Sequence, residues 1–122
     1  MKKNPVKDKS YIFALKMIKL YQYLAKEQKE YVLSKQLLKS ATSIGANIEE
    51  AIGGQSRKDF FAKISIAYKE CRETNYWLRL LRDSKIIPTE KAVQFIGDSN
   101  ELIRLIGSIK KTIQNNQEIL NS

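Results

Sequence analysis

The stretch SATSIGANIEEAIGGQSRKD, residues 40–59, decides the fold. Its first half repeats apolar residues at helical spacing, with small residues between them: Ala41, Ile44, Ile48 and Ala51. That spacing places the apolar side chains on one face of a helix. Gly53 and Gly54 are expected to end this helix, because glycine adopts the left-handed C′ conformation without strain. Ser56 begins the next helix, with Asp59 three residues on in a variant of the capping box. The stretch therefore predicts two consecutive helices joined by a short turn.

On both sides of this turn, the spacing of apolar residues predicts further helices, which makes four in all. The first is expected from about Ser10 to Lys26, and its apolar face comprises Tyr11, Ala14, Leu15, Ile18, Tyr21, Leu24 and Ala25. The second is expected from about Val32 to Ile52, with Leu37 added to the apolar face quoted above. The third starts at Ser56, ends near Asp83 and carries a core stripe of Phe60, Ile64, Ala67, Cys71, Thr74, Leu78 and Leu81. The fourth follows Pro88 with a cap at Thr89 and carries Ala92, Ile96, Leu102, Ile106, Ile109, Ile113 and Leu120.

The fold class follows from these helices and their short connections. No segment alternates convincingly with the period of two that a strand requires, and five glycines and two prolines are few in 122 residues. Four amphipathic helices with short links predict an all-α, up-down-up-down four-helix bundle. We expect one domain over residues 10–120, preceded by a basic, flexible tail at residues 1–9. Gly45, inside the second helix, indicates close approach of another helix, because glycine there costs about 1 kcal/mol relative to alanine.

Composition limits where the protein works. Cys71 is the only cysteine, which excludes an internal disulfide and fits a reducing, cytoplasmic setting. No continuous apolar run suggests a signal peptide or a membrane span. The formal net charge is +9, and residues 55–88 hold eight basic and four acidic side chains, whereas the last stretch has no net charge. The folded excess of positive charge is therefore expected on the third helix.

The residues of the common catalytic and metal sites are missing. The chain has no histidine, which removes the usual general base, the usual zinc ligand and every Ser-His or Cys-His pair. Glutamates at 49, 50, 70 and 73 cannot form the usual helical di-iron site without it, so solvated or paired glutamates are favoured over a metal centre. Gly53 to Ser56 lacks the Gly-Lys-Ser/Thr ending of a nucleotide-binding loop. We predict no enzyme activity, no metal and no cofactor.

Two surfaces of the third helix remain to be explained. One is basic, and its side chains lie close together on a helical projection, with Arg82 at the edge: Lys58, Lys69, Arg72, Tyr76, Arg79 and Arg82. It is either a nucleic-acid contact or an ordinary solvated face with Lys69 and Arg72 partly paired to acids such as Glu73. The other is apolar, lies roughly opposite the core stripe and suggests a subunit interface: Ile66, Trp77 and Leu80. Its alternative is a broad core face with scattered exposed residues.

Three segments together resemble a known family. They are Ser34 to Ser40, Ser43 to Ala51 and Gly53 to Phe60, and they look like the four-helix bundle proteins, also called the 23S rRNA-intervening sequence protein family. Residues 66–78 resemble the third helix of one branch. The family's Asn-Ile-x-Glu-Gly is here Asn47 to Ala51, and its Gly-Arg pair is Gly53-Gly54. The missing arginine weakens a role for this turn in phosphate contact. Asn47 and Glu50 match the motif, and we interpret them as structural, with partners across the bundle or in a neighbouring subunit.

The resemblance implies a cytoplasmic bacterial protein that assembles as a ring of five bundles. A related branch, the accessory protein of diversity-generating retroelements, implies binding of nucleic acid and of a reverse transcriptase through a basic surface. We therefore predict a homo-oligomeric, pentameric bundle that binds RNA or DNA through the basic stripe of the third helix. The alternative is a scaffold for an acidic protein partner, with no direct nucleic-acid role.

Overall fold

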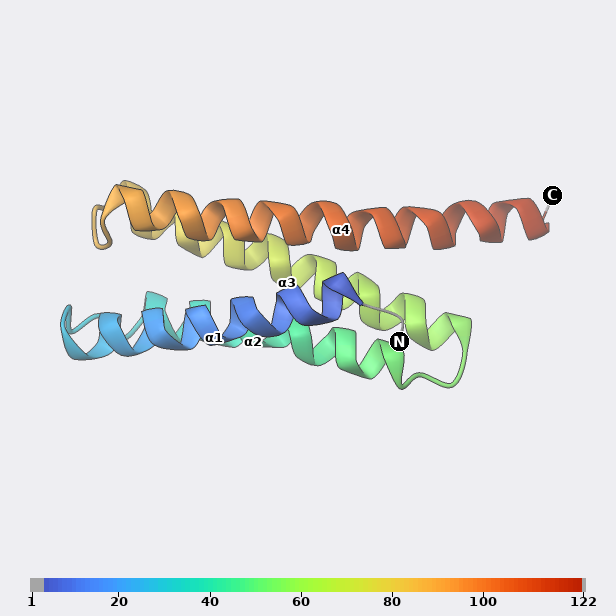
Figure 1. The fold of residues 1–122 in the computed structure, drawn as a ribbon, viewed down its shortest axis with the longest axis horizontal. Helices are drawn as coiled ribbons and strands as arrows, with labels where there is room; N and C mark the ends of the chain where they lie inside the picture. The colour runs from blue at the N-terminus through green and yellow to red at the C-terminus, as the bar shows by residue number, and fades with distance from the viewer. Residues whose placement is uncertain (1–3, 122) are drawn as a thin grey trace.

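The computed structural model describes the backbone of residues 4–121 and the side chains of residues 4–116. Its helices are α1 (Pro5–Lys26), α2 (Leu33–Ile52), α3 (Arg57–Asp83) and α4 (Thr89–Asn121). None of the described residues lies in a strand. Successive helices run in opposite directions, and the C-terminal end of α4 projects beyond the turn between α2 and α3 (Figure 1). The predicted all-α, four-helix architecture is confirmed.

The packing order places α1 and α3 on a diagonal. Helix α2 packs against both α1 and α3, and α3 packs against α4. The contact that closes the bundle, between α1 and α4, is the least extensive of the four. Figure 1 shows α3 crossing obliquely between α4 on one side and the α1–α2 pair on the other. Helices α1 and α3 therefore have outer surfaces on different sides of the molecule.

Helix α1 begins five residues earlier than predicted. The Asn4 side chain accepts a hydrogen bond from the Lys7 N–H at 3.1 Å, and Pro5 occupies the first turn. Proline suits that position because it has no N–H to satisfy and its φ is already helical. The prediction of a flexible tail is therefore wrong for residues 5–9, and residues 1–3 lie outside the described part of the chain.

The other helix starts differ in how well local sequence predicts them. Ser56 caps α3 as expected, since its hydroxyl accepts from the Asp59 N–H at 3.0 Å. Helix α4 already includes Thr89, and the Ala92 N–H bonds to the Pro88 carbonyl, so the predicted cap at Thr89 is one residue late. The turn after α2 ends the helix where predicted but for a different reason. Gly53 has φ −83°, and neither turn glycine has positive φ.

Gly54 is instead needed for space. Its N–H donates to the Ala51 carbonyl at 3.1 Å, and a Cβ at this position would lie 3.0 Å from that carbonyl oxygen. That separation is shorter than carbon–oxygen van der Waals contact. The chain therefore turns tightly against the end of α2 without any residue in the left-handed region.

The core confirms the predicted faces of α2 and α3 and most of that of α4. On α2 the five predicted residues are all buried, and on α3 only Phe60 is partly exposed while it still packs on the core. Four of the predicted residues of α4 are buried, from Ala92 to Ile106, and Ile109 packs beside them. Ile113 is half-buried, and the side chain of Leu120 lies outside the described residues.

Helix α1 contradicts its predicted face. The buried residues are Val6, Ser10, Phe13, Met17, Leu20 and Leu24, and only Leu24 belonged to the predicted stripe. Tyr11, Leu15 and Ile18 are instead 64%, 47% and 37% exposed. The reason is that α1 carries two apolar stripes at helical spacing, one on each side. Periodicity identifies both, but only the packing of α1 on α2 selects the one that is buried.

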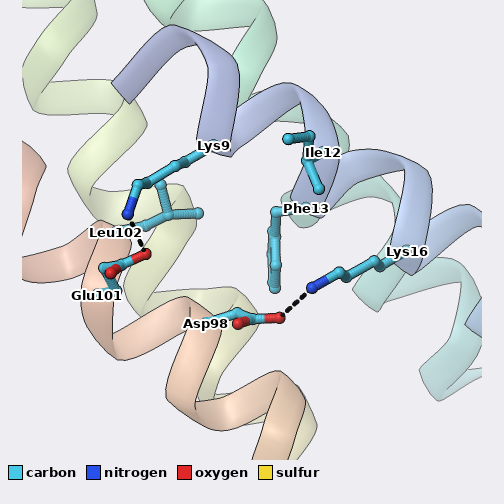
Figure 2. Close-up of a pocket in the computed structure, with 7 residues that line it drawn as sticks. All are labelled: Lys9, Ile12, Phe13, Lys16, Asp98, Glu101 and Leu102. Carbon is cyan, nitrogen blue, oxygen red and sulfur yellow. Dashed lines mark hydrogen bonds and ion pairs between the residues drawn. The ribbon is translucent and has the colours of Figure 1, made fainter. Parts of the chain in front are cut away.

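The contact between α1 and α4 consists of a buried phenylalanine ring with an exposed ion pair on either side. Phe13 is 2% exposed and points from α1 toward α4 (Figure 2). On either side of it, Lys9 Nζ lies 2.9 Å from Glu101 and Lys16 Nζ lies 3.0 Å from Asp98. A shallow hollow there is lined by these five residues with Ile12 and Leu102. Because its charged groups are already paired with one another, this hollow is not our candidate site.

Candidate nucleic-acid interface

The outer side of α3 carries the predicted basic residues on a helix held by its caps and by its buried stripe. Lys58, Lys69, Arg72 and Arg79 are exposed. Positions 58, 69, 72, 76 and 79 fall within about 80° at 100° per residue. This arc lies more than about 90° from the centre of the buried stripe, so the cations face away from the core. The structure places these five residues on one surface of α3, whereas Arg82 is half-buried and lies about 60° beyond Arg79, toward the buried stripe.

Most of these cations have no acidic partner. The described side chains form five ion pairs, and of the predicted basic residues only Arg82 takes part in one. Its Nε lies 2.8 Å from an oxygen of Asp83. That hydrogen bond raises the pKa of Arg82 and lowers the pKa of Asp83. Arg82 is therefore hydrogen-bonded to its neighbour, whereas the predicted pairing of Lys69 and Arg72 with Glu73 does not form among the described side chains.

Two tyrosines hold the arginine heads at the surface. The Arg79 guanidinium lies 5.7 Å from the centre of the Tyr76 ring, and the Trp77 ring meets that tyrosine edge-on at 5.2 Å. The Arg72 guanidinium lies 5.9 Å from the centre of the Tyr68 ring. Such cation–π contacts contribute about 0.5–1 kcal/mol at exposed sites. They limit the freedom of the guanidinium groups, whose terminal N–H donors make no hydrogen bond to a described residue and are available to an anion.

Helix α4 adds a cation that the sequence prediction missed. Lys110 Nζ lies 5.2 Å from the centre of the same Tyr68 ring, so lysine and arginine from two helices share one tyrosine. Gly107 allows this approach, since a Cβ there would lie only 3.2 Å from the Tyr68 ring. Lys110 was not predicted from the sequence because the last stretch has no net charge. Two of the acids that balance its charge, Asp98 and Glu101, pair with lysines of α1 on another face of α4. Sorting charges by helical face, rather than by segment, would have found it.

A polar cluster fixes α3 against α4 beside this surface. The Asn75 amide nitrogen donates to Ser99 Oγ at 2.8 Å and to Asn100 Oδ1 at 3.1 Å. Its own oxygen accepts from Arg79 Nε at 3.0 Å. Asn75 therefore positions Arg79 from the seam between the helices. Hereafter the basic face means Lys58, Lys69, Arg72, Tyr76 and Arg79 of α3 together with Lys110 of α4.

The predicted interface residues differ in exposure. Ile66 is exposed, and Leu80 is half-buried. Trp77 is half-buried and packs against the core of its own chain, with its ring N–H donating to Glu73 at 3.3 Å. The three residues do lie on one side of α3, next to the basic face. Trp77 is thus shared between the core and the surface.

The family-motif residues of α2 have local partners. A Cβ on Gly45 would lie 3.5 Å from Ser10 Oγ, so α1 and α2 approach closely there as expected. Asn47 donates to the Ser43 carbonyl of its own helix at 2.8 Å, which is not the partner across the bundle that we expected. Glu50 is exposed and lies 3.6 Å from Lys63 of α3, across the bundle as expected. The turn glycine Gly53 donates to Glu49 and ends the helix.

Other chemistry is sparse in the described part of the chain. Burial raises the pKa of the Cys71 thiol to about 12, and its sulfur donates to the Ser99 carbonyl at 3.4 Å. A thiol with this pKa is not a nucleophile near neutral pH. Between residues 4 and 116, no cluster of three or more metal-ligating side chains is present. No described helix has the length and apolar character that a membrane span requires.

Comparison with known proteins places this geometry in a family. The model of the 23S rRNA-intervening sequence proteins matches residues 2–108. The chain belongs to that family. A crystal structure of a protein of unknown function from the S23 ribosomal protein family of Bacteroides thetaiotaomicron is 52% identical, with a TM-score of 0.87. The match covers 91% of this chain and 99% of that one. A search of curated proteins finds no match.

Membership in the 23S rRNA-intervening sequence family confirms the resemblance seen between Ser34 and Phe60. The high structural similarity also agrees with the four-helix fold derived above. The C-terminal end of α4 lies beyond the residues that the family model matches. Lys110 is among these residues, so the α4 part of the basic face lies outside the segment that defines the family.

Proposed function

We propose that this family member is a non-enzymatic, homo-oligomeric bundle that binds nucleic acid through the basic face. One observation carries the proposal: the four exposed cations of α3 in this face have no ion-pair partner among the described side chains. A solvated helix face that merely keeps a protein dispersed usually mixes both signs of charge. On α3, Glu70 and Glu73 lie on the neighbouring apolar side, whereas Asp83 falls within the same arc near Arg79 and is paired with Arg82.

The physical basis of binding is charge rather than a base code. Each lysine or arginine that contacts a phosphate releases condensed counterions, which is a favourable entropy term that weakens with salt. Arginine guanidinium groups match the geometry of phosphate oxygens, and Arg72 and Arg79 are already ordered on tyrosine rings. The proposed site therefore reads the backbone of RNA or DNA and not its sequence.

Self-association is the second half of the proposal. The outer side of α1 has four exposed apolar residues, Tyr11, Ile12, Leu15 and Ile18, and on the apolar side of α3 Ile66 is exposed beside the half-buried Trp77 and Leu80. Neighbouring exposed apolar residues are typical of interaction surfaces. The family resemblance described above implies a ring of five bundles. In such a ring the basic face would be repeated, and several weak contacts to one strand combine into strong binding.

A double neutralisation tests the nucleic-acid half. We expect Arg72→Gln with Arg79→Gln to weaken binding to a structured RNA equally for unrelated sequences. The slope of log affinity against log salt should fall by about 2, because two phosphate contacts are lost. Fluorescence anisotropy over 50–300 mM salt measures both quantities.

The matched control is Lys35→Gln with Lys91→Gln, which removes the same charge from two exposed, unpaired lysines on α2 and α4. It should leave the slope nearly unchanged. Absence of binding by the wild-type protein at low salt would reject the proposal. If both double variants weakened RNA binding equally, binding would depend only on the net charge of the protein and not on the basic face. That result would favour the alternative of an acidic protein partner, which should remain bound after nuclease treatment.

A further inference from the structure

The outer stripe of α1 has no partner within the chain. It consists of Tyr11, Leu15 and Ile18, which fall within about 60° on the helix, with Ile12 beside them. All four are exposed. Lys19 and Lys26 follow one edge of the stripe seven residues apart, and neither forms an ion pair in the described structure. The α1 stripe is therefore apolar with a basic edge over its C-terminal half.

The apolar face of α3 has the opposite charge. Ile66, Trp77 and Leu80 lie within about 60°, and Glu70 and Glu73 fall on the same side of the helix. Neither glutamate has a lysine or arginine within ion-pair distance among the described residues. Burial and then the charge of Glu73 raise the pKa of Glu70, while Lys39 of α2 and Lys69 partly offset that increase from beyond ion-pair distance. Two adjacent carboxylates on an apolar surface favour a cationic neighbour.

We propose that the α1 stripe of one copy docks on this acid-edged α3 face of a second copy. The proposal rests on the self-association half of the proposed function and names the two surfaces that meet. Apolar residues would pack against apolar residues, with Lys19 and Lys26 set toward Glu70 and Glu73. Charge complementarity favours one partner surface and one register. It therefore favours this contact between unlike surfaces over a contact between two identical surfaces.

The position of the two faces makes the contact heterologous. Helices α1 and α3 lie on a diagonal of the bundle, so one copy presents both faces at once and on different sides. A contact between unlike surfaces propagates from copy to copy and either closes into a ring or continues as a filament. The competing arrangement pairs α1 with α1 in antiparallel fashion. It sets Asp8 near Lys26 but leaves the α3 face without a partner.

Mixing two blocked variants tests this inference. The α1 variant is Leu15→Glu with Lys19→Glu, and the α3 variant is Ile66→Lys with Glu73→Lys. We expect each alone to sediment as a monomer at micromolar concentration without nucleic acid. Mixed in equal amounts, they should form a heterodimer and nothing larger, because one intact α1 stripe meets one intact α3 face. Circular dichroism checks that each variant keeps its helices.

The outcomes separate this inference from the proposals it rests on. If the wild-type chain is a monomer, self-association and this inference both fail, while the RNA-binding test stands by itself. If the wild type assembles and the α3 variant still does, α1 pairs with itself and this inference fails. If a double variant does not fold, Lys19→Glu and Glu73→Lys replace the pair, since both positions are exposed. Each should weaken self-association at least about tenfold, and no change would overturn the inference.

Discussion

Glycines inside the helices occupy three different environments. A Cβ on Gly97 would meet nothing within 4 Å, and one on Gly45 would lie at ordinary contact distance from Ser10. A Cβ on Gly107 would lie 3.2 Å from the ring of Tyr68, so the ring would have to shift. Only Gly107 is next to the basic face, because Arg72 and Lys110 both make cation–π contacts with Tyr68.

We expect alanine to act differently at these three positions. Gly97→Ala should raise the free energy of unfolding by about 1 kcal/mol, since alanine favours the helix and meets no neighbour. Gly45→Ala should raise the free energy of unfolding by nearly as much, whereas Gly107→Ala should raise it clearly less or lower it. Urea unfolding followed by circular dichroism measures all three. An equal gain at Gly107 would show that Tyr68 is free to move and that the seam beside it is loose.

Among the helices, α2 has the least obvious start. Its first turn is capped by a side chain from the connection, because the Glu30 carboxylate accepts hydrogen bonds from the N–H groups of residues 32, 33 and 34 at 2.7–3.0 Å. Burial raises the pKa of Glu30, but these backbone hydrogen bonds outweigh it and leave the pKa lowered. The connection that looked merely polar in sequence therefore fixes where α2 begins.

Glu30→Gln should destabilise the protein by about 1 kcal/mol at pH 7, which is typical for loss of a helix cap. A lowered pKa in the folded state means that the ionised carboxylate stabilises the fold above the ordinary glutamate pKa, about 4.3. That contribution is lost as the pH falls through the folded-state pKa. The difference between wild type and variant should therefore shrink by pH 3.

Urea unfolding at pH 7 and pH 3 measures this difference. Glu27→Gln is the matched control, because Glu27 is exposed on the same connection and its side chain makes no hydrogen bond in the described structure. It should have little effect at either pH. An equal loss at both pH values would show that Glu30 contributes by packing rather than by its charge.

The bundle as a whole closes through its least extensive contact, between α1 and α4. Figure 2 shows one buried ring between two ion pairs there. The side chains of Lys16 and Asp98 are 49% and 38% exposed, so solvent screens their attraction. Exposed pairs contribute about 0–1 kcal/mol, whereas truncating a buried phenylalanine costs about 3–5 kcal/mol.

We therefore expect Phe13→Ala to lower the free energy of unfolding severalfold more than Lys16→Met. Raising the salt concentration from 50 to 500 mM should reduce the small loss of unfolding free energy in Lys16→Met and leave the loss in Phe13→Ala nearly unchanged. Chemical unfolding at both salt concentrations measures this. If Lys16→Met were as damaging as Phe13→Ala, the seam would depend on charge, and the bundle would open at high salt.

The sequence by itself determined the number of helices, most of their ends and the buried faces of α2 and α3. Each of those helices has one dominant apolar stripe, and local periodicity is sufficient when only one face can be buried. It also placed the cations of α3 together, since residues on one helix keep a fixed angular relation. The helix end at Gly53 was predicted at the correct residue, although neither glycine is left-handed and only Gly54 is needed, for space.

Only the tertiary structure decided between the two stripes of α1, because both have helical spacing and the choice depends on how α1 packs against α2 and α4. The contribution of Lys110 was hidden for the same reason. Its neighbours in sequence do not show that it lies beside Tyr68, forty-two residues away along the chain. Periodicity describes one helix at a time, whereas the surfaces proposed to bind RNA and a second copy are formed by the way helices meet.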